Sequence, residues 1–318
     1  MARMRRRDVL ASLAASAVLS AIARRARAAE SVDGKWQELT INPVDQDRYA
    51  PDVRDRAAFV THVEAFLAVL RSHPAWSRPK GFDVRPHLMW GSGGLFDRPP
   101  APIAAILMIQ TFWYGRDNRT GALSLGDESS LDLFVVFNSP EAIFDRQHGE
   151  MAREPGAGLY NEPNAQATKS PVPRFDSGHV ITRRGAPVFV PVTRKRLLEA
   201  WLAEARHDLR NDPRQARASA DIARIEHELA AMSASDAAEP AYCVGGPYLR
   251  KLASRGEKGA RAIAAANPAF FDGKLPRSAL QLAIVRHPSK GMSRDPDLLQ
   301  VFEKLEGQRW EKLLDVMA

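Results

Sequence analysis

Hydrophobic residues recur along the chain with two different periods, and each period predicts a different kind of element. In residues 54–71 and 193–209 apolar side chains return every three to four positions, as on the buried stripe of an amphipathic α-helix. Thr193 is placed to cap the second of these helices, and Asp212 to cap another that begins at Pro213. The pattern therefore predicts a helical hairpin, or one kinked helix, near residues 193–232.

Shorter runs that are rich in β-branched and aromatic residues predict strands. They cover residues 84–90, 103–114, 131–138 and 279–286. The run 103–114 is apolar on both faces, as expected of a strand that is covered on each side, and we expect the run 131–138 to pair with it in antiparallel fashion.

Two stretches that contain proline and glycine lie between the third and the fourth of these runs. Residues 149–178 show almost no periodicity and predict a long loop, which is uncommon unless it is functional or disordered. Residues 179–192 predict a β-hairpin that turns at Gly185. Its second strand carries Pro187 and Pro191, which donate no backbone hydrogen bond, so we expect that strand at a sheet edge.

Helical patterns return toward the end of the chain. Residues 259–266 are rich in alanine, the strongest helix former, and predict a helix. Further short helices are expected at residues 140–144, 295–305 and 310–314. Because strands and helices come in groups and do not alternate strictly, the pattern favours an α+β fold, an antiparallel sheet with helices mainly on one face. We expect residues 29–318 to form one large domain, with residues 233–240 as the possible boundary of a second.

Charge changes this picture mainly at the amino terminus. The 318 residues hold 45 Lys and Arg against 38 Asp and Glu, a net charge of +7. Residues 1–28 hold seven of the bases and one of the acids, a net of +6, so the remaining 290 residues carry 38 bases and 37 acids. A nearly neutral body lacks the large positive field of a nucleic-acid-binding protein, and we expect no nucleic-acid partner.

The first 28 residues have the three parts of an export signal. A basic start precedes the uncharged apolar run 9–23, and Ala26, Arg27 and Ala28 form a small-x-small cleavage site. The apolar run has 15 residues, fewer than the roughly 20 that an α-helix needs to cross the hydrocarbon core, so we expect no permanent membrane anchor. The expected product is a soluble, exported protein.

Arg6 and Arg7, followed by one polar and two apolar residues, resemble the twin-arginine export motif. The arginines that follow the apolar run are also similar to signals of that route. The resemblance covers only the signal, and it implies transport of the folded protein by the twin-arginine machinery into the bacterial periplasm. A general secretory signal with incidental arginines and an uncleaved amphipathic helix are the alternatives.

Motifs for cofactors and metals are absent from the rest of the sequence. Neither a phosphate-binding glycine loop nor a dinucleotide fingerprint occurs, and a single cysteine cannot attach a haem through two thioethers. The eight histidines are too widely spaced for a metal site on one helix, although Asp145, His148 and His179 could meet in space. We therefore expect no cofactor and no metal.

Four residues are candidates for catalysis, and none lies in a known catalytic motif. Ser92 stands in a glycine-rich stretch without the strand-to-helix turn of a nucleophile elbow, so a flexible turn is the simpler interpretation. Cys243 can act as a nucleophile only with a nearby base and a lowered pKa, and is otherwise a buried, inert thiol. His148 and His179 are the candidates for that base.

The most unusual local feature is the start of the helix predicted at residue 193. Arg194, Lys195 and Arg196 occupy its first turn, where the helix dipole already places partial positive charge. The preceding turn adds Arg183 and Arg184, so a phosphate, sulfate or carboxylate could bind here. Alternatively, the five side chains extend into water or pair with acids of the preceding loop: Glu150, Glu154 and Asp176.

Two functional hypotheses follow. The first is a periplasmic protein without catalysis that binds a small anionic ligand or an envelope partner at this basic cluster. The second is a cell-envelope hydrolase whose residues are dispersed in the sequence. The hydrolase requires its candidate groups to converge in space: Ser92, His148, His179 and Cys243.

Overall fold

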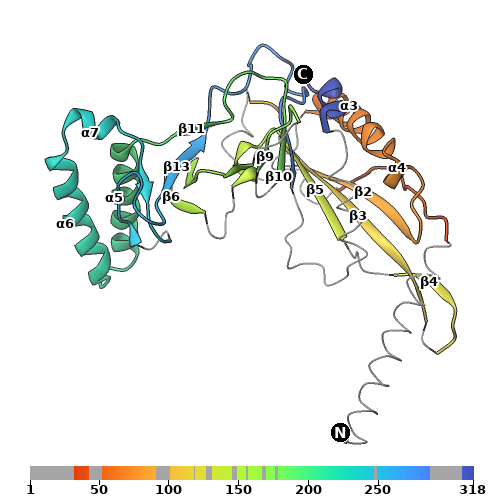
Figure 1. Ribbon diagram of the computed structural model, residues 1–318, viewed down its shortest axis with the longest axis horizontal. Helices are drawn as coiled ribbons and strands as arrows, with labels where there is room; N and C mark the ends of the chain where they lie inside the picture. Colours follow the sequence, from red (N-terminus) through yellow and green to blue (C-terminus); the bar gives the residue numbers. More distant parts are fainter. Residues whose placement is uncertain are drawn as a thin grey trace, which may run out of the picture.

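The computed structural model is an α+β protein with two lobes, each built around its own β-sheet (Figure 1). The structure describes residues 32–42, 52–90, 101–117, 119–126, 131–144, 149–154, 157–166, 170–175, 178–246, 249–286 and 310–318. The predicted α+β class is confirmed, and antiparallel pairs dominate, but the strands form two sheets instead of one. The export signal, with Arg6 and Arg7, lies outside the described residues.

The larger sheet has the strand order β1-β2-β3-β5-β14-β10-β9-β8, with β4 paired to β3. Its strands are β1 (Thr40–Ile41), β2 (Phe82–Trp90), β3 (Ala105–Arg116), β4 (Leu123–Leu125), β5 (Leu131–Phe137), β8 (Ala165–Gln166), β9 (Arg174–Phe175), β10 (Gly178–Ile181) and β14 (Ala283–Arg286). β2, β3 and β5 are long antiparallel neighbours, with Ile109 opposite both Pro86 and Leu133. The four strands predicted from apolar runs are thus confirmed with shifted ends.

Helices cover one face of the larger sheet. They are α3 (Val53–Arg71), the short α4 (Pro74–Ser77) beside it, and the 3₁₀ helix η4 (Trp310–Val316). Alternate side chains of the central strands, including Leu107 and Val135, are buried together with Phe59 and Phe66 of α3. α3 confirms the helix predicted for residues 54–71.

The smaller sheet runs in the order β11-β13-β7-β6, with β12 paired to β13. Its strands are β6 (Glu150–Glu154), β7 (Ala157–Asn161), β11 (Phe189–Pro191), β12 (Tyr242–Cys243) and β13 (Arg261–Ala266). Helices α5 (Arg194–Asn211), α6 (Ala216–Ala231) and α7 (Ala234–Ala238) belong to the same lobe (Figure 1). α5 packs directly on the sheet, where the indole of Trp201 donates a 2.8 Å hydrogen bond to the carbonyl of Met151.

α5 and α6 form the helical hairpin predicted near residues 193–232. Thr193 caps α5 as predicted, because its hydroxyl accepts a backbone amide hydrogen of the first turn. The second helix begins at Ala216, three residues later than the predicted start at Pro213. Asp212 instead closes a turn, since its carboxylate accepts a backbone amide hydrogen two residues on.

One apolar core lies between the larger sheet and α3, and a second lies between the smaller sheet and α5. A third apolar core joins the two sheets. The rings of Phe144 and Tyr160 are stacked there, with their centroids 4.3 Å apart, and Phe189 lies against Phe144 at 4.9 Å. From the larger sheet this core takes in Val180 of β10 and Ile284 of β14. Within the described part of the chain it includes no side chain of β2, β3 or β5, so those strands keep a second face that the smaller lobe does not cover.

The hairpin predicted for residues 179–192 does not form. β10 pairs with β14 and β9 in the larger sheet, whereas β11 pairs with β13 in the smaller sheet. The residues between them therefore cross from one lobe to the other, and Gly185 marks this crossing instead of a tight turn. The prediction that the strand with Pro191 lies at a sheet edge is confirmed, because β11 ends the smaller sheet.

The alanine-rich segment 259–266 contains the strand β13 and not the predicted helix. β13 lies in the middle of the smaller sheet and pairs with β11 on one side and β7 on the other. Both of its faces are buried, Ile263 and Ala265 in the core beneath α5, and Ala264 in the core that joins the lobes. Helix propensities differ by less than about 1 kcal/mol per ordinary residue, so strand pairing and burial outweigh them here.

Residues 149–178 contain paired strands where a long loop was expected. The described parts include β6 and β7, which pair with each other, and β8 and β9, which end the larger sheet. These strands have only two to five residues each, which is too short to leave a periodic signal in the sequence.

The remaining predictions concern short segments. Two of the expected short helices are present as 3₁₀ helices, η2 (Pro140–Ile143) and η4. The helix predicted at residues 295–305 lies outside the described residues. Residues 233–240, predicted as a possible domain boundary, hold α7 and lie within the smaller lobe.

Candidate functional site

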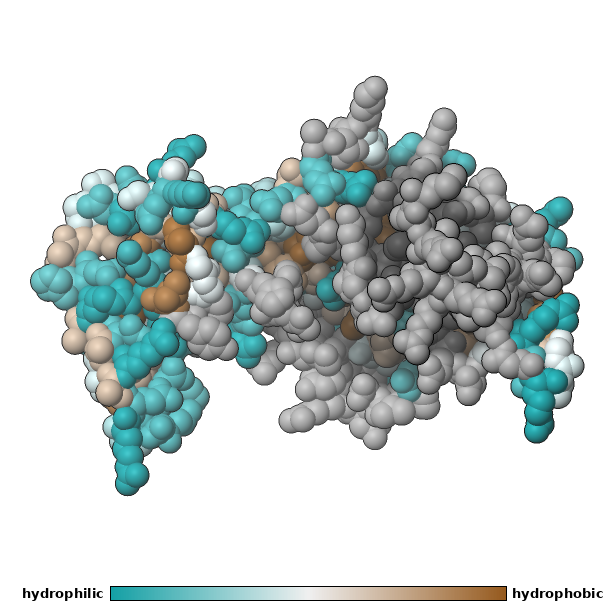
Figure 2. Space-filling model, turned by 60° about the horizontal axis from the view of Figure 1, so that its bottom comes forward, coloured by the Kyte–Doolittle hydropathy of each residue, from teal (hydrophilic) through white to brown (hydrophobic). Residues whose placement is uncertain are grey.

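All five cations of the predicted anion site have carboxylate partners. Arg183 pairs with Asp315, Arg184 with Asp272, Arg194 with Glu239, Lys195 with Glu199 and Arg196 with Glu154. The partners come from different segments, so the cations are distributed over separate ion pairs. The exposed surface of the smaller lobe, at the left of Figure 2, is mainly hydrophilic.

Arg196 forms the most regular of these pairs. Its Nε and Nη2 atoms donate hydrogen bonds of 2.9 and 2.7 Å to the two carboxylate oxygens of Glu154. A bidentate pair is strong and directional, and this pair fixes the start of α5 to β6. The partner is one of the acids named in the alternative interpretation of the basic cluster.

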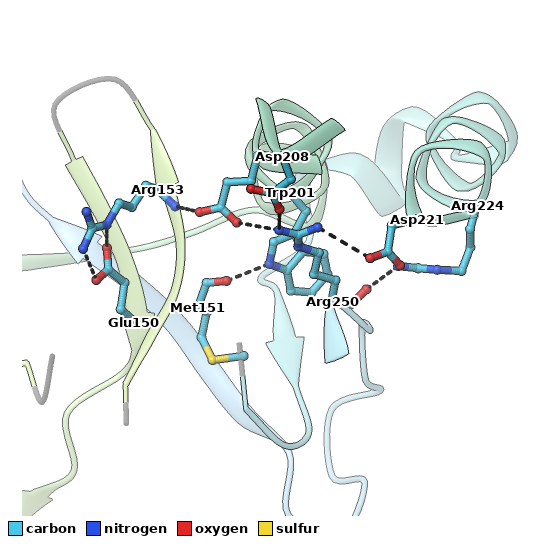
Figure 3. A network of polar contacts seen from close by, with 9 residues as sticks. Glu150, Met151, Arg153, Trp201, Asp208, Asp221, Arg224 and Arg250 are labelled. Carbon is cyan, nitrogen blue, oxygen red and sulfur yellow. Dashed lines mark hydrogen bonds and ion pairs between the residues drawn. The ribbon is translucent and has the colours of Figure 1, made fainter. Parts of the chain in front are cut away.

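A second arginine-centred network lies between the helices of the smaller lobe (Figure 3). Arg250, with 15% of its side chain exposed, places its guanidinium 2.8 Å from Asp208, 3.5 Å from Asp221 and 3.7 Å from Glu204. Its backbone carbonyl accepts a 2.6 Å hydrogen bond from Arg224. One arginine thus ties both helices of the hairpin to the segment that follows them.

Glu204, a member of this network, has a shifted pKa. Burial is the largest cause and raises the pKa of this carboxyl above its usual value, and Asp208 and Glu150 act in the same direction. The backbone amide of Arg153, which donates a 2.7 Å hydrogen bond to Glu204, and the charge of Arg250 oppose the rise. Since each arginine here has a carboxylate, we interpret the network as a clamp on the helical hairpin.

The candidates for nucleophilic catalysis that the structure describes do not converge. Cys243 is buried in the smaller lobe, and burial raises the pKa of its thiol to about 12, so the thiol stays protonated near neutral pH. His179 is buried in β10 of the larger sheet, where its ring centroid is 5.2 Å from that of Trp310. Ser92 and His148 lie outside the described residues.

Metal ligation and membrane insertion receive no support from the described residues. Among them, no group of three or more His, Cys, Asp and Glu side chains is arranged to hold a metal ion. Asp145 and His148, which could join His179 in such a group, lie outside them. The helices in the described ranges include none with the length and apolar character needed to span a bilayer.

A cluster of polar and apolar side chains on the second face of the larger sheet was not predicted from the sequence. Directly paired residues of an antiparallel sheet share a face, and the register places three rows of side chains on this one. The rows are Arg85–Gln110–Asp132, His87–Met108–Phe134–Arg286 and Met89–Ile106–Val136–Ile284. The first row is polar, the second mixed and the third apolar. Most of these side chains are half-buried, while Val136 and Ile284 are buried and Arg286 is exposed.

Arg85 is the most distinctive member of this cluster. Its guanidinium carbon lies 3.9 Å from the ring centroid of Phe112, so the cation is stacked on an aromatic face. Its Nε is buried without a hydrogen-bond partner, and no carboxylate of the described residues pairs with it. Asp83, two positions away on the same face, accepts hydrogen bonds from the Lys35 amide at 2.9 Å and the Tyr114 hydroxyl at 3.2 Å instead.

Two neighbours of Arg85 can hydrogen-bond to a bound molecule. Burial lowers the pKa of His87 below its usual value; Arg85 lowers it further and Asp132 opposes the change, so the imidazole is neutral near pH 7. Gln110 lies between Arg85 and Asp132 in the polar row and donates a 3.4 Å hydrogen bond to Asp132. The carboxylate of Asp132 is thus one strand further from Arg85 than Gln110 is.

The sequence holds only part of the signal for this cluster. Arg85 and His87 are two residues apart in a predicted strand, so alternation alone places them on one face. Gln110 and Asp132 join them only through the pairing register of β2, β3 and β5, which the sequence does not specify.

Comparisons with known proteins add no relative that bears on the site. No family model matches the chain, and no curated protein or solved structure is similar to it at a significant level.

Proposed function

We propose that the protein is an exported periplasmic binding protein, without catalysis, that holds a small anionic ligand on the second face of the larger sheet. The polar part of the site is formed by Arg85, His87 and Gln110. The observation that carries the proposal is Arg85, a half-buried, stacked cation without a carboxylate partner among the described residues. A guanidinium presents a rigid set of donors that matches a carboxylate or a phosphate.

The basic cluster predicted from the sequence is a less favourable place for the ligand. An anion near Arg196 would compete with the bidentate Glu154, and one near Arg194 or Lys195 would compete with acids already in place. At Arg85 no ion pair among the described residues has to be broken. The desolvation cost of a bound anion is therefore offset directly by a new charge-assisted hydrogen bond.

Calorimetric titration with benzoate, and with benzyl alcohol as its neutral counterpart, tests the site. Arg85→Gln should weaken benzoate binding about tenfold or more, since a hydrogen bond to a charged group contributes about 1.5–3 kcal/mol. Binding of benzyl alcohol should be weak and indifferent to the substitution.

Lys195→Gln is the control that removes the same charge from the basic cluster, and it should leave benzoate binding unchanged. The triple replacement of Arg194, Lys195 and Arg196 by Ser probes the whole start of α5. Should binding survive Arg85→Gln and disappear in either of these variants, the ligand binds at the start of α5 and the proposed site is wrong.

Export by the twin-arginine route is the second part of the proposal. It is supported by Arg6 and Arg7 ahead of an uncharged apolar run and a cleavage site. Replacement of both arginines by lysine should retain the protein in the cytoplasm, as fractionation of the cells would show. Unchanged recovery from the periplasm would exclude this route. No specific observation favours the hydrolase hypothesis.

A further inference from the structure

We infer that the ligand is a monocarboxylate with a flexible apolar tail, bound with its carboxylate on Arg85 and its tail across Met108 and Ile106. This inference rests on the proposed anion site at Arg85 and adds the chemical class of the ligand. It follows from the order of the three rows on the sheet face, which run from polar to apolar along the strands.

Apolar side chains begin one row from Arg85. Met108 lies opposite Phe134, and Ile106, in the next row, lies opposite Met89. All four are half-buried, and within the described residues none of them belongs to the three apolar cores. Apolar side chains beside a few polar groups are the usual lining of a small-molecule site, and the two methionines can adapt to a flexible tail.

The spacing of the rows sets the length of the ligand. Arg85 and Met89 are four residues apart on β2, which corresponds to about 13 Å in an extended strand. A medium-chain carboxylate covers this distance with its head on the polar row and its end on the apolar row. A site of mostly apolar lining with a few oriented polar groups is the usual form of a small-molecule site.

The charges on this face favour one carboxylate over two. Arg85 is the cation of the polar row, and the apolar row of Met89 and Ile106 holds no charged side chain among the described residues. Arg286 stands on β14, two strands and one row from Ile106, and so about 12 Å from the end of the tail. A second carboxylate at the end of the tail would therefore be desolvated without a partner.

Titration calorimetry with acetate, butyrate, hexanoate and octanoate tests the length of the tail. Affinity should rise about fourfold for each methylene that becomes buried, up to the end of the apolar row. Two probes of equal length test the head and the end of the tail. 1-Octanol should bind about tenfold more weakly than octanoate because it lacks the charge, and the dicarboxylate suberate should also bind more weakly than octanoate.

Ile106→Thr tests the tail within the protein. It keeps a β-branched residue in a central strand, so the variant should fold, which circular dichroism and thermal melting would verify. We expect several-fold weaker binding of octanoate and unchanged binding of acetate. Arg85→Gln should instead weaken both ligands by a similar factor. Arg286→Gln, which removes the same charge from the same face, should change neither.

The two proposals fail in different ways. Affinity that depends on Arg85 but not on chain length overturns the apolar tail and leaves the anion site standing. Equal binding of octanoate and 1-octanol that persists in Arg85→Gln overturns the anion site itself. Suberate that binds more tightly than octanoate, and loses this advantage in Arg286→Gln, overturns the monocarboxylate. Absence of binding by every probe overturns both proposals.

Discussion

Arg250 in the smaller lobe and Arg85 on the larger sheet are both partly withdrawn from water, but their partners differ. Three carboxylates lie within 3.7 Å of the Arg250 guanidinium (Figure 3). Arg85 has an aromatic ring beneath it and, in the described ranges, no carboxylate partner. The first arginine therefore holds parts of the chain together, whereas the Nε of the second has no hydrogen-bond partner, which supports the binding site proposed above.

This difference shows why a count of cations is a poor guide to an anion site. The densest basic stretch after residue 28, Arg194 to Arg196, lies in the lobe where ion pairs link α5 to its neighbours. Arg85 is the one Lys or Arg residue of β2, so no cluster of basic residues marks it in the sequence. What matters is whether a cation has a carboxylate within reach, and that depends on neighbours distant in sequence.

The largest expected difference between the two arginines is in stability. Arg250→Ala leaves Asp208, Asp221 and Glu204 without their shared cation and should lower the free energy of unfolding by about 3 kcal/mol. Arg85→Gln removes only a stacked cation and should cost less than about 1 kcal/mol. Chemical denaturation of the two variants measures both values. Equal losses in the free energy of unfolding would contradict the expected difference between the two arginines.

Arg250→Gly separates the side chain of Arg250 from its backbone. Arg250 has a φ of 40°, in the left-handed region that glycine adopts without strain. The glycine variant should therefore be about 1 kcal/mol more stable than the alanine variant. A glycine variant as stable as the parent protein would mean that the ion pairs of Arg250 contribute only about the 1 kcal/mol that glycine gains at this φ, well below the value expected from the alanine variant.

A smaller effect, and one of opposite sign in the two regions, is expected from pH. The pKa of His87 is lowered by burial in the folded protein, so on acidification below about pH 6.5 the unfolded chain is protonated first and the free energy of unfolding decreases. The pKa of Glu204 is raised, again mainly by burial, so the folded protein is protonated first and the free energy of unfolding increases until the pH reaches about 4.3.

His87→Gln and Glu204→Gln check these signs by thermal unfolding between about pH 4 and 7. His87→Gln should reduce the loss of stability of the parent protein as the pH falls below neutrality. Glu204→Gln should be at least as stable as the parent near pH 7 and should lose that advantage at lower pH. A steeper acid loss in His87→Gln would show that the pKa of His87 is not lowered.

Elements with a strong period of their own were predictable from the sequence. The stripes in residues 54–71 and 193–209 lead directly to α3 and α5, because one buried side of a helix is visible as a repeat of three to four residues. The segment 259–266 was not predictable in this way. Its alanines favour a helix in isolation, but two neighbouring strands and two cores make it the centre of a sheet.

The candidate site was predictable only in fragments. The sequence predicted Thr193 as a cap because capping is local, and it offered Glu154 as a partner for the basic cluster because of its opposite charge. The cluster around Arg85 was not, since it joins β2, β3 and β5 through a register set by long-range pairing.

The sequence by itself determined the α+β class, the main helices and long strands, and the nearly neutral charge of the chain after its basic first 28 residues. These properties depend on composition and local periodicity. The folded structure was needed to show that the strands divide into two sheets, that the predicted basic cluster is paired, and that Arg85 has no carboxylate partner among the described residues. The reason is physical, because the free energy of a charged side chain depends on which groups surround it after folding, and those groups come from distant parts of the chain.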